Sequence, residues 1–270
     1  MRKMTLSNVS RWLVQTWAFV FKNWIITKRS LFTLLEIIFW PVVGLFSVGL
    51  LTVFLRLEHE VTAFLLTGLI SMSMIQVCQI DVAYVLLYDL WSKSIKHTFI
   101  APVKPLQLIL GSWLIGVARS LFVFLLLSTI SSIAFGFNFL KPGIGPVTLF
   151  LLSLFLISAL VGVTVCILVL LYGYKAEVAA WSLVNVMYLI CGIYYPVSIL
   201  PSPLSEMARL IPLTYFLEFF RSFYGFRGEV ENGLGWGFSL TGFYLILVVV
   251  LFKGVLHRAR KTGILIKLSE

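Results

Sequence analysis

Residues 197–225 read VSILPSPLSEMARLIPLTYFLEFFRSFYG, and this stretch decides the fold that we expect. Ser202 followed by Pro203 predicts a helix start, because serine is a favoured N-cap and proline suits the first helical position. Pro212 then begins a second short helix, which carries Tyr215. A helix needs about 20 apolar residues to span a bilayer, and neither of these is long enough. The stretch therefore predicts a pair of half-helices that enter the outer leaflet and return.

The composition of the whole chain places that pair in a membrane. The chain has 270 residues, of which 60% are hydrophobic and 12% charged, and its mean hydropathy is +1.02. Soluble domains carry about 25% charged and about 45–50% apolar residues. A bilayer accommodates this apolar excess, so we predict an all-α integral membrane protein of the cell inner membrane, with residues 1–270 as a single transmembrane domain.

Apolar runs predict six membrane-spanning helices around the short pair, which belongs to a re-entrant and outer segment at 197–237. The expected spans are 31–55, 62–91, 106–137, 147–172, 178–196 and 238–256. The segments expected inside hold fifteen basic residues and those expected outside hold five, which by the positive-inside rule places both termini in the cytoplasm. The same distribution explains the net charge of +10 without nucleic-acid binding.

Residues 10–29 predict an amphipathic helix at the inner membrane surface. On a helical wheel, a polar face opposes an aromatic face, which suits a helix lying in the interface. We expect the aromatic residues at the acyl boundary and the cations toward water; a soluble bundle helix is the alternative. The polar face holds Arg11, Gln15, Lys22 and Arg29, and the aromatic face holds Trp17, Phe21 and Trp24.

Residues 192–201, reading GIYYPVSILP with Pro196 and Pro201, precede residues 211–215, reading IPLTY, and then Arg221. Together they resemble the C-terminal signature of type-2 ATP-binding-cassette (ABC) exporter permeases, which include drug, nodulation-factor and polysaccharide exporters. The resemblance extends along the chain and implies export of an amphipathic substrate: a drug-like compound, a lipid or a lipid-linked glycan.

The resemblance also implies partners. Residues of the form GxxxxGK[ST] do not occur in the sequence, so ATP hydrolysis is expected on a separate chain rather than on this one. We expect two ABC ATPase subunits that bind ATP and Mg, a second permease copy or a paralogue, and surrounding membrane lipids. This chain is expected to bind no cofactor itself.

In such permeases the inner loop between the second and third spans docks on the ATPase, and residues 91–105 occupy that position here. Family members often have a Gly-Thr-Leu-Glu run in this loop, whereas this chain has SIKH at 94–97. A basic solvated loop is the alternative for any single residue. The coupling candidates are Lys93, Ile95, Lys96, His97, Phe99 and Pro102.

Asp81 and Arg119 are ionisable residues within predicted spans, where charge is costly. Counting residues from the inner ends of their helices puts the two at depths that agree within roughly 5 Å. They form either a structural ion pair or, with Gln76 and Gln79, part of a substrate path or proton relay. The second role leaves an ion- or proton-coupled secondary transporter open as an alternative.

Neither catalysis nor a metal site is indicated by the reactive residues. Cys78, Cys166 and Cys191 lie in apolar runs, and no CxxC, HExxH or GxSxG motif occurs in the sequence. The cysteines are therefore interpreted as small buried hydrophobic residues.

Overall fold

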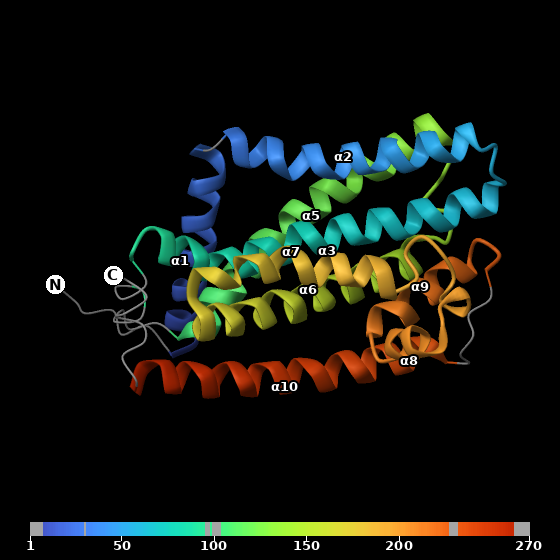
Figure 1. The fold of residues 1–270 in the computed structure, drawn as a ribbon. Helices are drawn as coiled ribbons and strands as arrows, with labels where there is room; N and C mark the ends of the chain where they lie inside the picture. Colours follow the sequence, from blue (N-terminus) through green and yellow to red (C-terminus); the bar gives the residue numbers. More distant parts are fainter. Residues whose placement is uncertain (1–7, 30, 95–97, 99–103, 227–231, 262–270) are drawn as a thin grey trace.

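The computed structural model describes residues 8–29, 31–94, 98, 104–226 and 232–261, and this part of the chain contains helices and no strand. Figure 1 shows long helices side by side, with short helices at one end of the bundle. The long helices are α1 (Asn8–Arg29), α2 (Leu31–Phe54), α3 (His59–Trp91), α5 (Pro105–Phe135), α6 (Ile144–Tyr172), α7 (Glu177–Ile190) and α10 (Gly233–Lys261). The short ones are η1 (Gly173–Ala176), η2 (Val197–Ile199), α8 (Ser202–Arg209) and α9 (Pro212–Ser222).

Five stretches of the described helices are long and apolar enough to cross a membrane. They confirm the prediction of an all-α integral membrane protein. The fourth stretch contains both α6 and α7, which are joined by η1. The stretches are Leu35–Phe54, His59–Trp91, Pro105–Phe135, Ile144–Ile190 and Gly233–Ala259.

The predicted span 178–196 is shorter as a helix than we expected. Helix α7 has 14 residues, which at 1.5 Å per residue is less than the roughly 30 Å thickness of a hydrocarbon core. The helix ends because Gly192 takes a left-handed φ of 69°. Figure 1 shows α7 returning beside α6, and its path toward the far end of the bundle is completed by non-helical residues.

Helix α3 forms the centre of the bundle and is buried along most of its length. Two glycines let its neighbours approach closely, as small residues do between membrane helices. A Cβ atom on Gly116 of α5 would lie 2.7 Å from the carbonyl oxygen of Cys78, and one on Gly162 of α6 would lie 2.6 Å from the Cβ of Val82. Helices α3, α5 and α6 therefore form a tightly packed unit, with α2 and α10 at opposite edges of the bundle (Figure 1).

The short helices α8 and α9 close one end of the bundle, and α9 is fixed there by aromatic packing. The ring of Phe220 stacks on Phe150 of α6, with centroids 4.2 Å apart and planes at 10°. Helix α8 starts one residue earlier than predicted, because the carbonyl of Pro201 accepts hydrogen bonds from the next turn and makes Pro201, not Ser202, the N-cap. Helix α10 also begins before 238, so it takes over the end of the predicted outer segment.

Helix α1 lies crosswise at the opposite end of the bundle (Figure 1). Trp17, Phe21 and Trp24 are exposed on one side of it, as expected for an aromatic face toward lipid. Its polar face also makes contacts with the bundle. Lys22 pairs with a carboxylate of α3, and Gln15 accepts a hydrogen bond from the side chain of Gln107 on α5, because the ends of those helices next to α1 present buried polar groups.

Candidate substrate cavity

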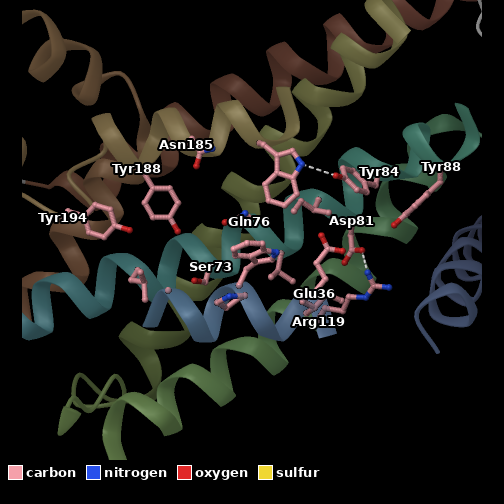
Figure 2. Close-up of a pocket in the computed structure, with 18 residues that line it drawn as sticks. Glu36, Ser73, Gln76, Asp81, Tyr84, Tyr88, Arg119, Asn185, Tyr188 and Tyr194 are labelled. Atoms are coloured by element: carbon pink, nitrogen blue, oxygen red, sulfur yellow. Dashed lines mark hydrogen bonds and ion pairs between the residues drawn. The ribbon is translucent and has the colours of Figure 1, made fainter. Parts of the chain in front are cut away.

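A cavity of about 530 Å³ lies between α2, α3, α5 and α7. Its volume is within the range of about 300–1,000 Å³ that is usual for small-molecule sites. Figure 2 shows the side chains that line it, contributed by all four helices. Polar groups and aromatic rings dominate the lining, which is unusual for the interior of an apolar bundle.

Many of the polar side chains of the cavity come from one side of α3. Ser73, Gln76, Asp81, Tyr84 and Tyr88 follow one another at intervals of three to five residues. Such intervals bring side chains to the same side of a helix. The opposite walls are formed by Glu36 and Trp40 of α2 and by Trp181, Asn185 and Tyr188 of α7.

Asp81 and Arg119 meet at one end of the cavity. An ion pair joins Arg119 Nη1 to Asp81 Oδ1, and both side chains are about 15% exposed. The second carboxylate oxygen, Asp81 Oδ2, is buried and accepts no hydrogen bond from the described residues. Both residues also line the cavity, so the ion pair lies in the cavity wall (Figure 2).

Aromatic contacts hold the rings of the lining in place. The Tyr84 and Tyr88 rings meet edge to face with centroids 5.6 Å apart, and Trp181 Nε1 donates a hydrogen bond to the Tyr84 hydroxyl at 3.2 Å. At the other end of the cavity, Tyr188 and Tyr194 stack with centroids 5.6 Å apart. The rings form two clusters, one near Asp81 and one distant from it (Figure 2).

The two predicted glutamines have different positions. Gln76 lines the cavity, whereas Gln79 is fully buried and donates a hydrogen bond from Nε2 to the carbonyl of Ala180, 2.9 Å away. Gln79 therefore joins α3 to α7 and does not line the cavity. Our sequence reasoning missed Tyr84 and Tyr88, although they continue at helical spacing the polar row that includes Asp81.

A polar cluster at the C-terminal end of α3 involves Asp89, which is almost fully buried. Its Oδ1 lies 3.1 Å from Lys22 Nζ, and its Oδ2 accepts a hydrogen bond of 2.7 Å from the Thr98 hydroxyl. Ser94 donates a longer hydrogen bond of 3.3 Å to Oδ1. The carboxylate thus connects the crosswise helix α1 to the loop after α3.

Among the predicted coupling residues, only Lys93 lies in the part of the chain that the structure describes. Lys93 is exposed and has a left-handed φ of 54°. Ile95, Lys96, His97, Phe99 and Pro102 lie outside the described residues, so their role stays a prediction.

Arg221 of α9 is buried, and none of the described carboxylates forms an ion pair with it. Its Nη1 donates to the carbonyl of Gly192, and its Nη2 donates to the carbonyls of Ile193 and Phe64, at 2.6–3.0 Å. The guanidinium also lies over the Phe64 ring, 3.4 Å from its centroid. Arg221 therefore joins α9 to the start of α3 and to the chain that leaves α7.

The other residues predicted in the re-entrant segment form its turns. Pro196 and Pro201 are the N-caps of η2 and α8, and Pro212 is the buried first residue of α9. The hydroxyl of Tyr215 donates a hydrogen bond of 2.8 Å to the carbonyl of Arg209. These contacts join α8 to α9 and keep the pair compact.

The fold therefore combines a bundle of apolar helices, a crosswise first helix and a short helical pair before the last helix. A family model described as ABC-2 type transporter matches residues 14–224. The chain belongs to the ABC-2 type transporter family. As a member of this family it is the membrane permease subunit of an ABC transporter and a multi-pass membrane protein.

Two relatives match different lengths of the chain. The inner membrane transport permease YadH of Escherichia coli is 26% identical over 197 residues, which cover 73% of this chain and 75% of the relative. An uncharacterized protein of Archaeoglobus fulgidus is 43% identical over 61 residues, which cover 23% of this chain and 95% of the relative.

Proposed function

We propose that this ABC-2 permease subunit exports an amphipathic substrate from the cytoplasm or the inner leaflet, with ATP hydrolysis on partner subunits as the driving force. The observation that carries the proposal is the cavity between α2, α3, α5 and α7, which places polar and aromatic groups inside a membrane-spanning bundle. A drug-like compound, a lipid or part of a lipid-linked glycan has the mixture of polar and apolar surface that such a lining matches.

The proposed assembly has two permease chains and two ABC ATPase subunits, and those ATPase subunits bind ATP and Mg. The loop at 91–105 is the proposed contact with the ATPase, and both termini are proposed to be cytoplasmic. Support for that contact comes from the cluster at Asp89, since a loop that docks on a partner needs a fixed connection to the helices. Replacing Phe99 by Asp should uncouple ATP hydrolysis from transport or release the ATPase, because an interface does not tolerate an unpaired buried carboxylate.

The proposal is tested by reconstituting the chain in proteoliposomes with an ABC ATPase that co-purifies with it. Export requires transport that depends on ATP, that vanadate stops, and that is lost when the phosphate-loop lysine of the ATPase is changed to Ala. A protonophore should leave this transport unaffected. Transport that needs no ATP and stops with the protonophore would instead favour the proton-coupled secondary transporter.

A further inference from the structure

We propose that the cavity binds a monovalent organic cation with a bulky apolar body, a narrower substrate class that rests on the proposed export function. Three features of the lining support this inference. One carboxylate is not matched by a basic residue, aromatic rings surround the space, and the basic side chain, Arg119, is already paired with Asp81.

The charges of the lining sum to an excess of one carboxylate. Glu36 and Asp81 are its acidic residues, and Arg119 is the one basic residue among the described lining. Arg119 is already paired with Asp81. Glu36 is exposed and forms no ion pair with any of the described side chains, so its charge is available to a ligand. An isolated carboxylate beside an apolar space favours a positive charge nearby.

Aromatic rings surround the same space. A cation over the face of an aromatic ring is attracted by the ring quadrupole, and tryptophan and tyrosine provide the strongest such contacts. Both clusters of rings border the cavity, and Glu36 lies at the same end of the cavity as Asp81 (Figure 2). The rings that line the cavity are those of Trp40, Tyr84, Tyr88, Trp181, Tyr188 and Tyr194. This combination of ring faces and one carboxylate without a basic partner suits a cation that has an apolar body.

The same lining disfavours an anionic substrate. A phosphate or diphosphate would need Arg119, and binding it would break the pair and leave Asp81 as an uncompensated carboxylate. A neutral glycan would find hydrogen-bond partners but no use for the charge of Glu36. The test must therefore compare ligands that have the same shape and differ in charge.

Tetraphenylphosphonium and tetraphenylborate provide that separation, because they have nearly the same shape and opposite charge. Each is titrated by equilibrium dialysis against the purified full chain in nanodiscs of zwitterionic lipid, and binding to empty nanodiscs is subtracted. We expect saturable binding of the cation and an affinity for the anion that is lower by at least about tenfold. Equal affinities, or tighter binding of the anion, would overturn the proposal.

Variants then locate the binding in the cavity. Glu36→Gln should weaken tetraphenylphosphonium binding by about tenfold, whereas Glu206→Gln, on the exposed surface of α8, should leave it unchanged. Tyr188→Phe should retain binding and Tyr188→Leu should reduce it, since only the first keeps a ring face. An unchanged affinity in Glu36→Gln, with a thermal melt like that of the parent, refutes the assignment.

The binding measurement uses no ATPase and no transport step. If tetraphenylphosphonium binds as expected but reconstituted export fails, the error lies in the proposed function. If ATP-driven export is found but the cation does not bind selectively, the error lies in the substrate class.

Discussion

Lys22 of α1 and Asp89 of α3 form an ion pair with 3.1 Å between Nζ and Oδ1, although 67 residues separate them in sequence. The carboxylate is 3% exposed and the ammonium group's side chain is 40% exposed. The Thr98 hydroxyl donates a hydrogen bond to the same carboxylate. A movement of the loop after α3 would therefore be transmitted through Asp89 to α1. The crosswise helix is thus connected to the segment that is proposed to contact the ATPase.

Removing the two members of this pair should have unequal effects on stability. Lys22→Met removes one partner of Asp89, and pairs with a half-exposed member are worth about 1 kcal/mol or less. Asp89→Ala removes the acceptor of Lys22, Ser94 and Thr98 together and should cost about 1–3 kcal/mol. Thermal melting in detergent measures both, with Lys175→Met, an exposed lysine of η1, as the control for Lys22→Met. A larger loss in Lys22→Met than in Asp89→Ala would contradict the central role of the carboxylate.

The Asp81–Arg119 pair predicts a non-additive double mutant. Asp81→Asn or Arg119→Gln alone strands a charge inside a span, which for buried pairs costs about 3–5 kcal/mol, and less where water or snorkelling relieves it. The double variant replaces both charges and should recover much of the loss. A double-mutant cycle from detergent melting curves measures the coupling. Additive losses would show that the pair contributes nothing to stability, and a stable but transport-dead double variant would establish a role in the substrate path.

Arg221 should not be replaceable by lysine. The guanidinium donates to three carbonyls from two nitrogens in a fixed plane, an arrangement that a single ammonium group does not reproduce. Arg221→Met leaves those carbonyls unsatisfied and should lower stability by about 3 kcal/mol, with Arg221→Lys recovering only part. Arg209→Met, at the exposed end of α8, is the matched control. Melting temperatures equal to that of the parent in both Arg221 variants would refute this account.

Thiol labelling tests the membrane orientation and the burial of the cysteines. Cys78, Cys166 and Cys191 are buried, so the parent protein should not react with an impermeant maleimide until it is denatured. In intact cells, Glu206→Cys should be labelled from outside and Lys175→Cys only after permeabilisation. The reverse pattern would invert the predicted topology, and rapid labelling of the folded parent would contradict the packing around the native thiols.

The sequence was sufficient for the class of fold and for the approximate position of most helices. Apolar runs determine membrane helices with little ambiguity, because a lipid-exposed backbone must satisfy its own hydrogen bonds. The end of α7 was harder to predict, since the turn at Gly192 depends on the contacts of Arg221, which lies 29 residues further along the chain. Local patterns do not show that a distant arginine will bond the carbonyls of a helix end.

The cavity was predicted only in part. The depths of Asp81 and Arg119 follow from counting residues along two antiparallel helices, so that juxtaposition was accessible from the sequence. Which residues of α2 and α7 face α3 depends on helix rotation, which the nearly uniform apolarity of membrane helices leaves undetermined. Tyr188 and Asn185 therefore could not be assigned to the same space as Asp81 until the helices were placed.

The two glycine contacts of α3 have a mechanical consequence for transport. Gly116 of α5 and Gly162 of α6 leave no room for a Cβ atom against α3, so a larger residue at either position would push these helices apart. Helix α2, in contrast, has many of its large apolar side chains directed away from the bundle. We therefore expect any change in the width of the cavity during a transport cycle to come mainly from displacement of α2, which is less buried in the bundle than α5 or α6.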